Sequence, residues 1–205
     1  MRNRYNNDLN SLKDMDKELM ELIILCYDKI DLYLENNNNR NLKEVVDLDN
    51  DITMNASEIE RFCFELLALQ QPVASDLRFL QMSIKLASTY KRMASHLSQA
   101  SNIMLEYKLD DKEEDFIKRF LANQKKMAKD SITSFVTIDN DLALKSMEDD
   151  EINNHLFVEA INYIAQLNKQ NSIDAIELSE KVLLYKYFER LGDRLARVGD
   201  LATRL

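Results

Sequence analysis

Apolar residues recur at steps of three and four along most of the chain, which is the spacing of a helix with one buried face. The first such pattern runs from Leu9 to Tyr33 and is interrupted only by Asp16. It predicts one long helix over about 5–35, in which Asp16 is a register device or a partly solvated position. Four asparagines at 36–39 end this helix, because their side chains bond the nearby backbone in turns.

The same spacing predicts five further helices. The second ends before Pro72, because the residue that precedes a proline disfavours the α region, and the third begins just after it. The pattern weakens at 109–111 and then restarts. It predicts helices over about 112–136 and 141–168, and a last one from the turn at 168–172 to the C-terminus.

Three helices, a restart and three more helices indicate an internal duplication. Asp49-x-x-Ile52 recurs as Asp149-x-x-Ile152 at an offset of 100, and the 90–95 segment resembles the 188–193 segment at an offset of 98. We therefore expect an all-helical fold of two pseudo-symmetric three-helix bundles. The two repeats are predicted over residues 1–108 and 109–205.

Composition narrows the classes of function. Two glycines and one proline among 205 residues exclude β folds rich in turns and every glycine-rich phosphate loop, so phosphate itself is not expected to bind. The net charge of −9 argues against nucleic acid and anionic lipid as partners, and is compatible with protein partners and cations. No apolar run approaches the length of a membrane span or of a signal peptide core, so we expect a cytoplasmic protein.

Two segments resemble the two repeat motifs of the PhoU family: Gln-Gln-Pro-Val-Ala-Ser-Asp-Leu-Arg at 70–78 and Phe-Glu-Arg-Leu-Gly-Asp at 188–193. The resemblance covers essentially the whole chain and implies a non-enzymatic regulator of phosphate uptake that represses the phosphate regulon. It implies contacts with the ATPase subunit of the phosphate ABC transporter and with the phosphate-sensing histidine kinase, and a homodimer. Five motif residues are expected to serve structure or partner contacts: Gln71, Pro72, Asp76, Arg78 and Arg190.

The resemblance also implies iron or zinc, because some family members bind these metals through a Glu-x-x-x-Asp motif. Glu189 and Asp193 complete that motif, and a spacing of four puts both on one helical face. Counting back from the neighbouring turns brings Asp149 and Asp130 to about the same level. These four carboxylates are the predicted metal site of the second repeat, and their oxygens also suit magnesium, manganese or calcium.

The first repeat departs from the motif, because Lys91 and Ser95 stand at the positions that match Glu189 and Asp193. Counting from the turn near residue 71 brings Asp49 into reach of Lys91. We therefore expect an ion pair between Lys91 and Asp49 in place of a first metal site.

Three alternatives stay open from the sequence. In the first, Glu189 and Asp193 pair with neighbouring arginines on a solvated helix face. In the second, the chain is a carboxylate-bridged iron protein with a redox or storage role. A third is a related helical scaffold for another transporter. The two histidines, His96 and His155, lack Glu-x-x-His spacing and a nucleophile in motif context, so an enzyme is not expected.

Overall fold

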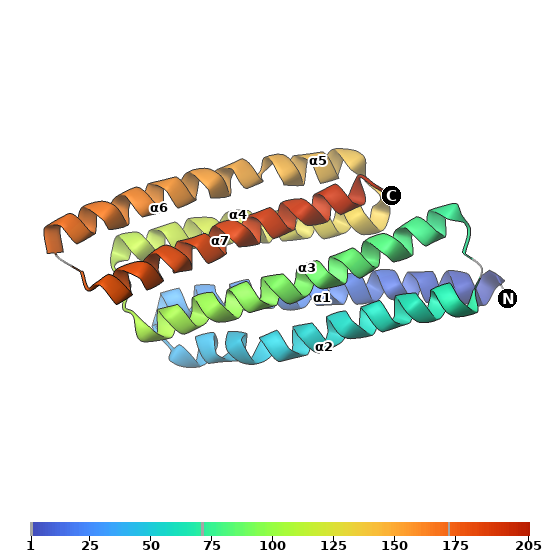
Figure 1. Ribbon diagram of the computed structural model, residues 1–205, viewed down its shortest axis with the longest axis horizontal. Helices are drawn as coiled ribbons and strands as arrows, with labels where there is room; N and C mark the ends of the chain where they lie inside the picture. Colours follow the sequence, from blue (N-terminus) through green and yellow to red (C-terminus); the bar gives the residue numbers. More distant parts are fainter. Residues whose placement is uncertain (1, 71, 172) are drawn as a thin grey trace.

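The chain is helical almost throughout, as expected (Figure 1). The computed structural model describes residues 2–70, 72–171 and 173–205. Its helices are α1 (Arg2–Asn36), α2 (Asn39–Leu69), α3 (Ala74–Glu106), α4 (Asp111–Thr137), α5 (Asn140–Glu148), α6 (Asp150–Asn171) and α7 (Ala175–Ala202). The all-helical prediction is confirmed, and the helix expected over 141–168 is divided at Asp149 into α5 and α6.

Short polar side chains fix where four of the helices begin. Asn38, Asp110, Asp139 and Asp174 each accept a hydrogen bond from a backbone N–H in the first turn of the helix that follows. At α4 the cap is reciprocal, because Glu113 accepts a hydrogen bond from the Asp110 backbone at 2.9 Å. The polar residues between the apolar patterns therefore define the helix starts.

The connections between helices use no glycine, since Gly192 and Gly199 both lie inside α7. Two other residues adopt the left-handed backbone conformation instead: Asn37, with φ of 52°, and Ile138, with φ of 58°. Asparagine tolerates this conformation, whereas a β-branched residue is strained in it. The turn between α4 and α5 is therefore held in place by the packing of the helices on either side.

Two groups of helices lie side by side along the long axis of the molecule (Figure 1). Helices α1, α2 and α3 pack together as one group, and α4, α5, α6 and α7 as the other. The groups join where α3 packs against α7 and α1 against α4. Over the described residues, no helix is long and apolar enough to cross a membrane.

Asp16 lies fully buried in the first group of helices, so it does not take the partly solvated position considered from the sequence. The Ser83 hydroxyl donates a hydrogen bond to its carboxylate at 3.0 Å, and the Tyr90 hydroxyl donates one to its backbone carbonyl at 2.6 Å. Desolvation raises the pKa of Asp16 well above its ordinary value, against a smaller lowering by Ser83. Asp16 thus fixes the register of α1 against α3 through polar contacts.

Candidate functional site

Three carboxylates converge where α6 begins to pack on α7. Glu189 and Asp193 are one turn apart on α7, and Asp150 is the first residue of α6. Desolvation, and then the charges of Asp193 and Glu189, raise the pKa of Asp150 to about 6, against a hydrogen bond from Asn153 at 3.0 Å. The pKa of Asp193 is also raised, first by desolvation and then by the charge of Glu189. The second repeat therefore carries a cluster of mutually repelling carboxylates.

This acidic cluster depends on Gly192. A Cβ at position 192 would lie 2.5 Å from the Asn153 side-chain nitrogen and would also overlap the Asp150 carboxylate. Behind it, the buried side chain of Gln124 donates hydrogen bonds to the Phe188 carbonyl at 2.6 Å and to Asn153 at 3.3 Å. Glycine thus lets the polar residues of α6 lie directly against the backbone of α7.

Only two of the four predicted metal ligands belong to this cluster. Asp149 turns to α4 instead, where its carboxylate lies 2.5 Å from the Lys126 ammonium and its backbone carbonyl accepts a hydrogen bond from Asn123 at 3.0 Å. Asp130 is half-buried on α4 and is not among the charges that shift the pKa of Asp150 or Asp193.

The prediction that Asp149 converges with Glu189 is therefore wrong by one residue. Counting residues from a turn gives the position of a residue along the helix axis. It does not give the direction of the side chain, which changes by about 100° from one residue to the next. The next residue, Asp150, takes the place assigned to Asp149.

The carboxylates that do converge are a poor fit to a metal centre. Lys186 already donates to one oxygen of Glu189 at 2.6 Å, while the other oxygen is buried without a hydrogen-bond partner. Across the part of the chain that the structure describes, no three His, Cys, Asp or Glu side chains are grouped so that they could hold one metal ion. Iron or zinc binding stays a prediction from the family resemblance.

The expected ion pair of the first repeat is also corrected. The Lys91 ammonium lies 2.7 Å from Glu60 and does not pair with Asp49. Desolvation raises the pKa of Asp49, and hydrogen bonds with the hydroxyls of Ser98 and Thr53 offset only part of this rise. The prediction was wrong in register, because Asp49 of α2 lies beside Ser98 of α3, which is nearly two turns beyond Lys91.

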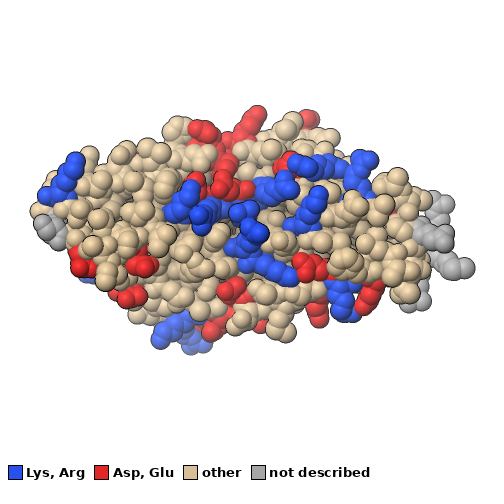
Figure 2. Space-filling view, viewed as in Figure 1, with Lys and Arg blue, Asp and Glu red and all other residues tan. Residues whose placement is uncertain are grey.

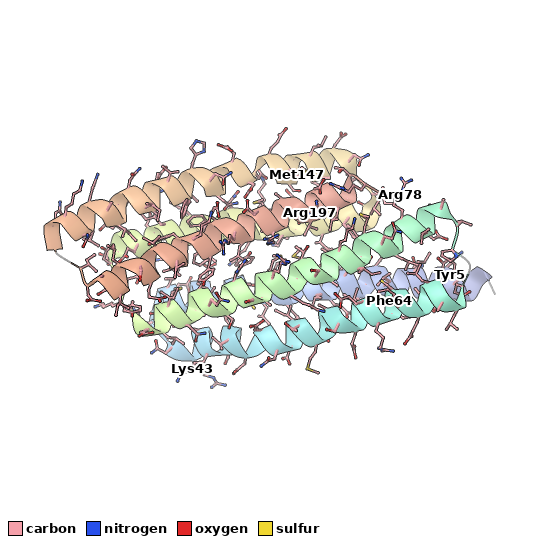
Figure 3. The ribbon with its side chains drawn as sticks, in the orientation of Figure 1. Tyr5, Lys43, Phe64, Arg78, Met147 and Arg197 are labelled. Carbon is pink, nitrogen blue, oxygen red and sulfur yellow. The ribbon has the colours of Figure 1, made fainter. Side chains whose placement is uncertain are left out.

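The first-repeat motif residues lie around the start of α3. Pro72 is half-buried between α2 and α3, whereas Gln71 is outside the described residues. Asp76 is in the first turn of α3, and its charge adds to the desolvation that raises the pKa of Tyr5 to about 12. Arg78 is exposed near the start of α3 (Figure 3).

A second charged cluster, the basic seam, was not predicted. We use that name for Arg92 and His96 of α3 together with Arg190 and Arg194 of α7. The His96 ring stacks on Tyr187, with ring centroids 5.5 Å apart. Desolvation, and then the charges of Arg190, Arg194 and Arg92, lower the pKa of His96 to about 4. Figure 2 shows basic side chains gathered over the middle of α3 and α7.

A signal for the basic seam is present in the sequence. Arg92 matches Arg190, and His96 matches Arg194, at the same offset of 98 that indicated the duplication. What the sequence did not show is that α3 and α7 pack against each other, which brings the equivalent pairs of the two repeats together. Each pair has a spacing of four and so occupies one helical face.

The fold and these clusters define a class of protein: a duplicated helical bundle whose repeats join along two pairs of equivalent helices, α3 with α7 and α1 with α4. The PhoU domain model matches residues 17–104 and 117–202, once in each repeat, and the chain belongs to the PhoU family. The resemblance stated from the two motifs is thereby confirmed.

Named relatives and solved structures agree with this family. A "phosphate-specific transport system accessory protein PhoU homolog" of Borreliella burgdorferi is 24% identical over 98% of this chain and 94% of its own length. A homolog of the same description from Aquifex aeolicus is 29% identical over 87% of this chain and 83% of its own length. The fold is similar to the crystal structure of PhoU from Pseudomonas aeruginosa, with a TM-score of 0.88 and 18% identity over 97% of this chain and 96% of that one.

Proposed function

We propose that this chain is a phosphate transport accessory protein that regulates phosphate uptake through contacts with other proteins. The observation that carries this proposal is the double PhoU match, which accounts for both halves of the chain. Relatives that align over nearly their whole length are named as accessory proteins of phosphate-specific transport systems. The family is a transport accessory family, and a regulatory role without catalysis fits it.

The partners we propose are the ATPase subunit of the phosphate ABC transporter and the phosphate-sensing histidine kinase, with repression of the phosphate regulon as the result. Long helices with charged outer faces make a rigid scaffold suited to such contacts, and a cytoplasmic homodimer fits the role. The histidines do not favour an enzyme: His96 stacks on Tyr187, and His155 is exposed beside Glu151.

Capture of the two partners tests this function. The tagged full-length chain should retain the transporter ATPase and the sensor kinase of its own organism in separate binding measurements with purified components. Deletion of its gene should switch on a phosphate-starvation reporter in phosphate-rich medium. A folded chain that retains neither partner, or a deletion that leaves the reporter off, overturns the proposal.

A further inference from the structure

Most arginines whose side chains the structure describes are paired with a carboxylate. Arg40, Arg61, Arg119, Arg197 and Arg204 each form an ion pair within 4.0 Å. Within the described residues, Arg78 and the three arginines of the basic seam form none. The chain has 36 acidic residues and only 27 basic ones, so carboxylates are in excess overall. Three unpaired arginines in one place therefore call for an explanation.

The basic seam brings like charges together from two helices. Its half-buried imidazole lies among the arginines of α3 and α7, and desolvation and the charges of Arg190, Arg194 and Arg92 all lower the pKa of that imidazole. One carboxylate that these arginines influence is Asp193: Arg194 and Arg190 lower its pKa, but neither forms an ion pair with it. Glu189, the other carboxylate on this stretch of α7, is held by Lys186. A bound anion would offset the repulsion among the arginines.

The seam also has unused hydrogen-bonding capacity. The His96 Nδ1 and Arg194 Nε atoms are buried without a hydrogen-bond partner. Arg92 on α3 and Arg190 on α7 are both exposed. A guanidinium group presents two N–H donors in a fixed fork, which matches two oxygens of a phosphate or sulfate ion. The arrangement offers such forks from two helices at once.

We propose that the basic seam binds a tetrahedral oxyanion, with inorganic phosphate as its ligand, through Arg92, Arg190 and Arg194 beside His96. Side chains from two helices supply the positive charge that a glycine-rich loop supplies in other proteins, so the scarcity of glycine does not exclude an anion site. The inference goes beyond the proposed function, because it makes the chain itself responsive to phosphate. It does not depend on either partner protein.

Histidine NMR on the intact chain tests this site, because His96 and His155 are the only histidines. His155 is exposed on α6 and outside the seam, so it is an internal control. Titration with inorganic phosphate should shift the His96 resonances in a saturable way and raise the pKa of His96 by about one unit. His155 should not shift, and sodium chloride at equal ionic strength should move neither. Equal shifts with chloride, equal shifts of both histidines, or no shift with phosphate would overturn the site.

A pair of charge-matched variants locates the binding. Arg190→Gln should weaken phosphate binding by about tenfold or more, because it removes one guanidinium fork. Arg61→Gln removes the same charge from an exposed pair with Glu65 on α2 and should leave the affinity unchanged. In the phosphate-free protein, Arg190→Gln should also raise the pKa of His96, which shows that the seam is still assembled. Equal losses in the two variants would mean that binding follows overall charge and not this site.

Discussion

At the scale of single residues, two adjacent aspartates have opposite surroundings. Asp149 ends α5 and lies against the Lys126 ammonium on α4. Asp150 begins α6 and faces Glu189 and Asp193 on α7. The two carboxylates differ by a single step along the chain, yet one gains an opposite charge and the other meets two like charges. Their contributions to stability therefore have opposite signs.

Asp150→Asn should stabilise the protein above pH 6. The folded-state pKa of about 6 lies above the unfolded value of about 3.9, so the folded state binds more protons between these values. The stability that Asp150 contributes is thus fully present below pH 4 and is lost as the pH rises to about 6. Asparagine removes the repulsion and keeps an acceptor for the hydrogen bond from Asn153.

Urea unfolding at pH 5 and pH 7.5 measures this effect. The gain from Asp150→Asn should be larger at pH 7.5 than at pH 5, while the matched variant Asp149→Asn, which loses the pair with Lys126, should give no gain at either pH. A loss of stability in Asp150→Asn at pH 7.5 would contradict this account of the acidic cluster.

At the scale of helices, α7 carries both glycines of the chain, and each faces a different neighbour. A Cβ at position 199 would lie 2.9 Å from the Ala143 backbone carbonyl and 2.6 Å from the Ser146 hydroxyl, both on α5. At position 192 the three nearest atoms would all belong to the side chains of Asp150 and Asn153. Backbone contact at Gly199 therefore sets how closely α5 approaches α7.

Gly199→Ala should destabilise the protein more than Gly192→Ala. Alanine gains about 1 kcal/mol in helix propensity at either position, so the difference between the variants reports the steric cost alone. We expect Gly199→Ala to lose on the order of 1–3 kcal/mol in free energy of unfolding, because a backbone segment must move. Urea unfolding of both variants checks the order, and a smaller loss for Gly199→Ala would show that α5 can shift freely.

Helices and their grouping could be predicted from the sequence, because an apolar stripe and a capping aspartate are local signals. Asp139 and Asp174 begin helices near the predicted positions. Glu189 and Asp193 were placed together correctly, since their spacing lies within one helix. Contacts between helices could not be predicted in the same way. The partner of Lys91 depends on the stagger of α2 against α3. The grouping of His96 with Arg194 depends on which helices face each other.

At the scale of the whole molecule, the two groups of helices share their central packing. Helices α1, α3, α4 and α7 each contact both their own group and the opposite one. Separating the groups would expose apolar faces of all four helices to water. The repeats are therefore coupled energetically.

A single unfolding transition is expected for the full chain. Leu12→Ala in the first group and Phe120→Ala in the second both remove fully buried side chains and should each cost about 2–5 kcal/mol. Because of the shared packing, each variant should shift the whole transition in urea, followed by far-UV circular dichroism and tyrosine fluorescence. Two separate transitions, of which only one moves in each variant, would show that the repeats unfold independently.

The packing of α3 against α7 also has an evolutionary consequence. Duplication normally gives two copies of a surface that can change separately. Here the equivalent pairs Arg92–His96 and Arg190–Arg194 face one another, so the two copies form a single electrostatic environment. A substitution in one repeat therefore alters the electrostatic surroundings of the other repeat as well as its own.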